Sequence, residues 1–331
     1  MNAAHFGRRR ALAVIAAAAG APLLASDAGA KRAPVLEWRG RALGAKARLL
    51  LAHPEPAAAR RVIARCLDEI ARLERIFSLH LPDSEIATLN RTGRLDAASH
   101  DLRILLAEAQ RVGALSGGAF DVTVQPLWQL YAAHFAAHPG DTVGPPAHRI
   151  EAARRRVDYR AIAIDGTRVS LLRPAMAVTL NGIAQGYVSD RIAELLRAAG
   201  FASVLVQLGE TVAGAPRADG RPWRVGIPDP FAPDRVIAAL DAVDVAIATS
   251  SGRATRFDTA GRHHHLLDPA TGRSADRCAS ATVLAPRATT ADALSTALAV
   301  LPPAAAIPLL REAGATAFYV ASDHSRRWLG T

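Results

Sequence analysis

The segment 289–296 reads TTADALST and holds two oxygen-bearing side chains, Asp292 and Thr296, four residues apart. On a helix this spacing places both side chains on one face. Carboxylate and hydroxyl oxygens suit Mg²⁺ or another hard cation. An Asp near a helix start also compensates the helix dipole, and Thr290 can cap the helix. The spacing therefore leaves a metal site and a structural role both open.

Three adjacent histidines, His263, His264 and His265, precede the turn sequence DPATG. Neighbouring side chains point to opposite sides of an extended chain, so three imidazoles cannot share one ion. We expect His265 to point into a site, as a base or a phosphate partner, and the other two to lie on the surface.

The stretch 180–190 reads LNGIAQGYVSD and leads into a helix. A helix N-terminus beside Gly182 offers backbone N–H groups, a positive dipole end and room for close approach, which suits a phosphate. The stretch matches neither GxGxxG nor the P-loop, so an ordinary strand-to-helix turn stays open. The chain also has no GxSxG elbow, paired-cysteine redox motif or HExxH motif.

The periodicity of apolar residues indicates which elements position these side chains. It predicts helices at 56–76, 101–115, 183–199, 291–301 and 305–313, and strands at 176–180, 203–208, 223–227, 245–249, 280–285 and 316–321. A short strand or turn is expected at 119–123. The order lacks regular βαβ alternation, which favours an α+β fold with a largely antiparallel sheet. The Pro- and Gly-rich loop 136–150 is the best candidate for a division of one large domain into two lobes.

The composition describes a chain of 331 residues, half of them hydrophobic, with a formal charge of +10. Such a charge suggests nucleic acid as a partner. However, the basic residues are scattered, nearly all Arg and mixed with acids, and aromatic residues make up only 5%. We therefore predict no nucleic-acid partner, while the charge is compatible with an anionic substrate.

Residues 1–30 have the pattern of a signal peptide. Arg8, Arg9 and Arg10 form a basic start, an Ala-rich apolar stretch follows, and Ala28-Gly29-Ala30 supplies a cleavage pattern. The arginines resemble a twin-arginine signal, with a general secretory signal as the rival. The apolar stretch is too short for a stable membrane span. We expect a mature domain at 31–331 that works in a bacterial periplasm.

The chain has two cysteines, Cys66 and Cys278. They could pair in an oxidising compartment. Cys66 falls on the apolar face of a predicted helix, which favours a buried free thiol. Two cysteines so far apart do not make a zinc site.

Seven segments, taken together in order, resemble the ApbE family of FAD:protein FMN transferases. They are FSLHLPDSEIATLN (77–90), GGAFDVTVQPL (117–127), LNGIAQGYVSD (180–190), PWRVGIPDP (222–230), ATS (248–250), HLLDPATG (265–272) and TADALSTAL (290–298). The resemblance runs from about residue 37 to the end of the chain. It implies an α+β fold with T-fold-like character.

The resemblance also implies an activity. Members cleave the pyrophosphate of FAD, attach FMN through a phosphoester to a Thr or Ser hydroxyl of a target protein, and release AMP. The metal is usually Mg²⁺. For this chain, the implied partners are FAD and a periplasmic or membrane-anchored acceptor flavoprotein.

Site residues follow from the same resemblance. Asp292 and Thr296 would bind the metal through their side chains and Gly182 through its main-chain carbonyl. His265 would assist proton transfer from the acceptor hydroxyl. The flavin-binding positions are Ala119, Phe120, Asp121 and Leu266.

The chain departs from the family pattern at several positions. Thr179 replaces an acid that helps to hold FAD, Gln185 replaces a lysine, and His80 replaces a tyrosine that stacks on the flavin. Glu210 stands where the family often has the Asp of LGGD. These changes keep the metal ligands and bear on FAD binding. Two other functions stay open: an Mg²⁺-dependent FAD pyrophosphatase, and a non-catalytic periplasmic flavin-binding assembly factor.

Overall fold

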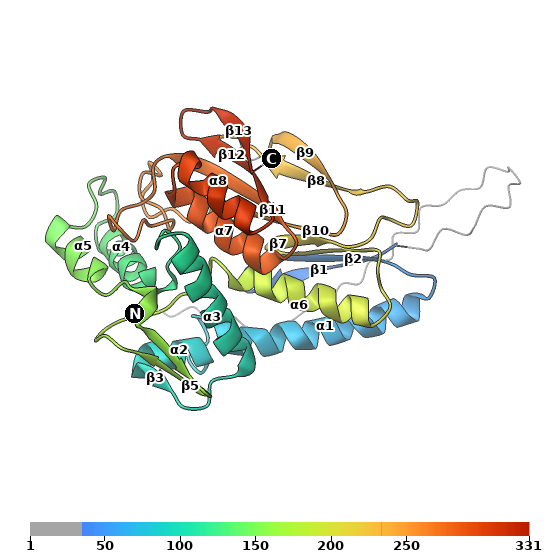
Figure 1. Cartoon of the computed structure of the whole chain (residues 1–331), viewed down its shortest axis with the longest axis horizontal. Coiled ribbons are helices and arrows are strands. Elements are labelled where there is room, and N and C mark those ends of the chain that lie inside the picture. Colours follow the sequence, from blue (N-terminus) through green and yellow to red (C-terminus); the bar gives the residue numbers. More distant parts are fainter. Residues whose placement is uncertain (1–34, 233, 331) are drawn as a thin grey trace, which may run out of the picture.

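An eight-stranded antiparallel sheet forms the centre of the computed structural model, which describes residues 35–232 and 234–330 (Figure 1). Its strands, in spatial order, are β1 (Val35–Ala42), β2 (Ala45–Ala52), β6 (Val204–Leu208), β7 (Glu210–Ala213), β10 (Val245–Ser250), β11 (Cys278–Ala285), β12 (Thr316–Ala321) and β13 (Arg326–Leu329). Every neighbouring pair is antiparallel. The predicted α+β fold with a largely antiparallel sheet is confirmed.

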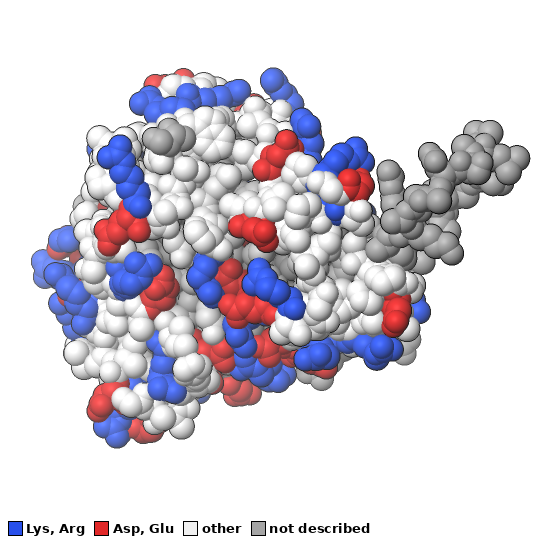
Figure 2. Space-filling view, turned by 45° about the vertical axis from the view of Figure 1, so that its right-hand side comes forward, with Lys and Arg blue, Asp and Glu red and all other residues white. Residues whose placement is uncertain are grey.

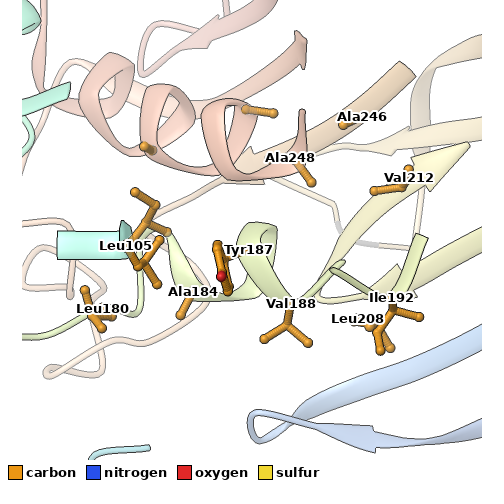
Figure 3. Close-up of a cluster of buried hydrophobic side chains, with 14 of the residues drawn as sticks. Leu105, Leu180, Ala184, Tyr187, Val188, Ile192, Leu208, Val212, Ala246 and Ala248 are labelled. Carbon is orange, nitrogen blue, oxygen red and sulfur yellow. The ribbon is translucent and has the colours of Figure 1, made fainter. Parts of the chain in front are cut away.

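Helices cover one face of this sheet. They are α1 (Pro56–Phe77), α6 (Ala184–Ala198), α7 (Ala288–Val300) and α8 (Pro303–Glu312), with α3 (His100–Leu115) packed on α1 and α7. Figure 3 shows Val188 and Ile192 of α6 beside Leu208 of β6. Alternate strand residues share one face, so Val212, Ala246 and Ala248 join the same core. The opposite face carries a hairpin of β8 (Trp223–Pro228) and β9 (Val236–Ala242).

Smaller elements lie at the end of the sheet. They are α2 (Glu85–Thr92), α4 (Gln125–Ala137), α5 (Ala147–Arg154), two 3-10 turns (Val122–Val124 and Tyr159–Ala161), and a three-stranded sheet of β3 (Arg94–Leu95), β5 (Arg168–Leu171) and β4 (Ile162–Asp165). Helices α4 and α5 share a small core with Leu267. This core holds the loop that carries His265 against the rest of the molecule.

The predicted helices are confirmed to within three residues at their ends, and the predicted strands after residue 200 to within two. The predicted strand 176–180 is wrong, because this segment joins no sheet. Instead the Asn90 side chain pairs with Val178: Asn90 Nδ2 donates to the Val178 carbonyl at 2.8 Å, and Val178 N donates to Asn90 Oδ1 at 2.6 Å. One amide side chain thus takes the place of a strand neighbour.

The segment 119–123 is a turn that leads into the first 3-10 turn. The predicted loop 136–150 is shorter than expected, since α4 ends at Ala137 and α5 begins at Ala147. Cys66 and Cys278 are buried and free, as predicted for Cys66, and burial raises the pKa of each thiol to about 12. The signal-peptide prediction for residues 1–30 falls outside the described residues.

Across the face drawn in Figure 2, basic and acidic side chains alternate over short distances. In the part of the chain that the structure describes, many charged side chains form ion pairs, such as Arg72 with Glu69 and Arg154 with Glu151. The two signs of charge are therefore mixed on this face. Among the helices that the structure describes, none is both long and apolar enough to cross a membrane.

The close crossing of α6 and α7 leads to a first prediction. A Cβ at Gly186 would overlap the carbonyl oxygen of Ala288 and lie 2.8 Å from Asp292 Cβ. Gly186→Ala should therefore lower the free energy of unfolding by about 1–3 kcal/mol, as overpacking does elsewhere. Urea denaturation measures this change. Arg197→Ala, on the exposed face of α6, is the matched control and should change stability by less than about 0.5 kcal/mol. Equal stability of both variants would contradict the proposed crossing.

Candidate functional site

Helix α7 carries the residues predicted to bind metal, and its start is fixed by Asp190 of α6. The Asp190 carboxylate accepts hydrogen bonds from Ala288 N at 2.8 Å, Thr289 N at 2.9 Å and Thr289 Oγ1 at 2.6 Å. The prediction that Thr290 caps this helix is wrong, because Thr290 already lies inside the first turn. The cap comes from a residue about a hundred positions earlier, which local sequence patterns do not reveal.

Asp292 lies one turn further along α7 and is 4% exposed. Its Oδ2 accepts a hydrogen bond from Gly186 N at 2.9 Å, while Oδ1 accepts none from the described residues. Burial raises the pKa of this carboxyl to about 7; the Gly186 N–H lowers it, and the charge of Asp190 raises it. The Asp292 carboxyl group therefore keeps one oxygen, Oδ1, free for another partner.

Glu210, at the start of β7, is a second buried acid beside Asp292. Its Oε2 accepts a hydrogen bond from Thr249 N at 3.2 Å. Burial, and then the charge of Asp292, raise the pKa of Glu210 well above its usual value. Burial and mutual repulsion disfavour the charged forms of these two carboxyl groups, and a bound cation would stabilise them.

Thr296 follows Asp292 by one turn and lies against Gly182. A Cβ at Gly182 would lie 2.9 Å from Thr296 Oγ1, so only glycine lets the two segments approach this closely. Thr296 Oγ1 also lies 3.2 Å from Ser250 Oγ, which pairs with Ser295 Oγ at 2.7 Å. The start of α6 thus runs beside α7, with Gly186 at Asp292 and Gly182 at Thr296.

The donor chemistry at this crossing fits a hard cation. Within residues 35–232 and 234–330, no group of three or more His, Cys, Asp or Glu side chains could hold a metal. A site here therefore depends on one carboxylate, one hydroxyl and a main-chain carbonyl, an all-oxygen set of the kind Mg²⁺ prefers. The uncommitted Oδ1 of Asp292 and the close approach at Gly182 are the observations that support this fit.

A narrow pocket of about 50 Å³ opens beside Gly182 and Thr296. Most of the predicted flavin and catalytic residues line it: Ala119, Phe120, Asp121, Thr179, His265 and Leu266. These residues come from three separate segments of the chain, and Thr296 of α7 adds a fourth. The pocket is smaller than a dinucleotide, so FAD would extend beyond it.

Asp121 has a structural role in this pocket, because both of its carboxylate oxygens accept hydrogen bonds from the protein. Its Oδ1 accepts hydrogen bonds from Thr123 N at 2.8 Å and Thr123 Oγ1 at 2.6 Å, and its Oδ2 accepts one from Tyr159 N at 3.0 Å. Burial raises the pKa of this carboxyl, and these donors lower it. With both oxygens occupied, Asp121 fixes the backbone at 119–124.

His265 is held by one carbonyl group. The Thr255 oxygen lies 3.1 Å from both His265 N and His265 Nδ1. A carbonyl only accepts, so Nδ1 carries the proton and Nε2 carries the lone pair. Burial lowers the pKa of the imidazole, which keeps it neutral near pH 7. His265 is thus prepared to accept a proton at Nε2.

The other two histidines differ from the prediction. His264 is buried, with Nε2 2.8 Å from the Ala275 carbonyl, so its predicted surface position is wrong. His263 is half-buried and packs against Tyr131 and Phe135.

Two predicted FAD contacts lie outside the pocket. Gln185 packs on the turn between β6 and β7, where a Cβ at Gly209 would lie 2.5 Å from Gln185 Oε1. His80 is exposed beyond the end of α1.

The helix start itself offers fewer donors than the sequence suggests. Ile183 N and Ala184 N both donate to the Leu180 carbonyl, and Gly186 N donates to Asp292. Three of the N–H groups at this helix start are therefore already bonded within the protein. The stretch instead positions a carboxylate and a close-packed glycine at the candidate metal site.

Comparisons with known proteins agree with this architecture. The model of the ApbE family matches residues 43–320. A FAD:protein FMN transferase of Vibrio cholerae is 33% identical over 246 residues, which cover 72% of each chain. One of Treponema pallidum is 31% identical over 85% of this chain and 83% of its own.

Solved structures give the same result. The flavin transferase ApbE of Vibrio cholerae superposes with a TM-score of 0.76 at 25% identity, over 89% of this chain and 97% of that one. The ApbE protein of Thermotoga maritima superposes with a TM-score of 0.78 at 27% identity, over 88% and 96%. The chain belongs to the ApbE family, and it is a transferase.

The Asp190 cap allows a second prediction. Asp190→Asn removes the charge from three hydrogen bonds at the start of α7 and should destabilise the protein by about 1–3 kcal/mol. Thr290→Ala, at the position expected from sequence to cap, should change stability by less than about 0.5 kcal/mol. Urea denaturation of both variants compares the two positions. A larger loss for Thr290→Ala would refute the assigned cap.

Proposed function

We propose that this chain is an exported, metal-dependent FAD:protein FMN transferase, which attaches FMN to a Thr or Ser hydroxyl of a target flavoprotein and releases AMP. The observation that carries the proposal is the convergence of a candidate cation site and a neutral, oriented imidazole on one pocket. Gly182, Thr296 and His265 line that pocket together. Membership of a family whose curated relatives have this name supports the same reaction.

In the proposed reaction, the acceptor hydroxyl oxygen bonds to the phosphorus of the FMN half. The bond between that phosphorus and the bridging oxygen breaks, and AMP leaves with the bridging oxygen. The hydroxyl proton passes to His265 Nε2, which is free because Nδ1 is bonded to Thr255. The apolar walls formed by Phe120 and Leu266 limit the access of water, which would otherwise compete as the nucleophile.

Asp292, Thr296 and the carbonyl of Gly182 would hold the cation, with Mg²⁺ as the proposed ion. When bound, such an ion neutralises pyrophosphate charge and stabilises the charge that develops on the leaving phosphate. The role of this chain is to keep the oxygen ligands fixed. The bonds from Gly186 to Asp292 and from Ser250 to Thr296 do this.

The proposed location is the bacterial periplasm, by the twin-arginine route. The support is the signal-like pattern of residues 1–30, with Arg8, Arg9 and Arg10 before an apolar stretch. The acceptor would then be a periplasmic or membrane-anchored flavoprotein.

One labelling experiment tests the function. The mature chain is incubated with FAD, Mg²⁺ and an FMN-acceptor domain, and the acceptor is weighed by mass spectrometry while AMP is quantified. We expect one FMN per acceptor and one AMP per FMN. AMP release without labelling would instead indicate a FAD pyrophosphatase, and FAD binding without AMP release would indicate a non-catalytic flavin-binding factor.

Asp292→Asn tests the cation site. The amide can still accept the Gly186 hydrogen bond, yet it removes the buried charge, so the fold should survive. Transfer should fall by about a hundredfold or more, because charge stabilisation by a metal is worth several kcal/mol. Mg²⁺ should raise the Tm of the wild type and leave that of the variant unchanged. Retained Mg²⁺-dependent transfer would rule out this ligand.

The pH dependence tests His265. Since burial lowers its pKa below the usual 6.5, the neutral base persists below that pH and is lost only on further acidification. Transfer measured from about pH 5 to 8 should rise with pH to a plateau, with an apparent pKa under 6.5. His265→Ala should abolish this rise, slow transfer and leave FAD binding intact. Wild-type transfer by that variant would contradict the assigned role.

A further inference from the structure

A second cavity, of about 490 Å³, lies at the carboxyl end of β10. Its lining includes Thr249, Ser251, Arg253, Arg256 and Ser280. Thr249 and Ser250 are neighbours on β10, and neighbouring side chains of a strand point to opposite faces. Ser250 contacts Thr296, so this cavity and the candidate cation site lie on opposite faces of β10.

The cavity carries uncompensated positive charge. Neither Arg253 nor Arg256 forms an ion pair with any carboxylate of the described residues; Arg253 donates to the main-chain carbonyl of Pro230. The one acid in the lining, Asp229, is held by the Phe231 N–H at 2.9 Å and lies 3.6 Å from Arg326. Two guanidinium groups are thus available to an anionic ligand.

A buried hydroxyl without a partner adds an independent sign of a ligand. Ser280 is 2% exposed, and its Oγ forms no hydrogen bond with the residues that the structure describes. A buried hydroxyl without a hydrogen-bond partner is unfavourable. A polar ligand atom in the cavity could supply the missing bond.

The same segment connects this cavity to the reaction. Arg253 and Arg256 flank Thr255, whose carbonyl accepts hydrogen bonds from both His265 N and His265 Nδ1. A ligand held by the two arginines would therefore sit beside the residue that orients the proposed base.

We propose that this cavity binds an acidic segment of the acceptor protein, next to the hydroxyl that receives FMN. The inference rests on the proposed function. FAD is the less suitable occupant, because its pyrophosphate would be neutralised on the other face of β10. A carboxylate of the acceptor fits the paired guanidinium groups, and a second polar atom fits Ser280. Arg253 and Arg256 are thus positioning residues for the acceptor.

The test uses the mature chain and an FMN-acceptor domain that carries Asp or Glu near its acceptor Thr. Arg253→Glu and Arg256→Glu should each raise the KM for the acceptor about tenfold, with the KM for FAD within about twofold of the wild type. Arg253→Lys should keep most of the affinity. Arg60→Glu, on the exposed face of α1, is the matched control for net charge and should change neither constant.

Charge reversal gives the sharper result. An acceptor whose flanking acids are replaced by lysine should bind the wild type poorly and regain affinity with the Arg253→Glu, Arg256→Glu double variant. An unchanged KM for the acceptor in both single variants would overturn the inference, and a raised KM for FAD would assign the cavity to FAD instead. If the wild type transfers no FMN at all, the proposed function fails first, and this inference with it.

Discussion

The contact between α6 and α7 at Gly186 is the constraint on which the candidate site depends. No side chain fits between the helices there, and the freed main-chain N–H of Gly186 bonds to Asp292. One turn later in α6, the Asp190 carboxylate accepts hydrogen bonds from Ala288 N and Thr289 N and so caps α7. The crossing therefore sets both the position of α7 and the orientation of its carboxylate.

The crossing also concentrates negative charge in the interior. Asp292, Glu210 and Asp190 all lie at this end of the core, and the first two have raised pKa values because burial disfavours their charged forms. Hydrogen bonds from the backbone offset part of this cost. A bound cation would offset more of this cost. The buried negative charge that is unfavourable for the protein alone therefore favours metal binding. Such local costs are typical of functional sites.

The sequence predicted the features that depend on local pattern. The periodicity of apolar residues located the helices that carry Asp292 and Gly182, and ordered motifs identified the residues that meet in the pocket. The sequence pattern could not predict interactions between distant segments. Asn90 replaces a strand neighbour for Val178, and Thr255 fixes the tautomer of His265. These contacts depend on tertiary packing, which single-residue spacing does not encode.

The structure shows where the residues that depart from the family pattern lie relative to the pocket. Gln185 and His80 were expected at the flavin, but the structure places both outside the pocket, whereas Thr179 does line it. Glu210 was noted only as a replacement within a motif, and it proves to be a buried partner of Asp292. Burial, and not residue type alone, separates the residues that shape the site from those that border it.

A crystal structure of the mature chain with FAD and Mn²⁺, a substitute for Mg²⁺ that scatters anomalously, tests the proposed cation site most directly. We expect an anomalous peak about 2.0–2.3 Å from Asp292 Oδ1, Thr296 Oγ1 and the carbonyl oxygen of Gly182. A peak bound by other residues, or FAD bound with no metal between α6 and α7, would contradict it.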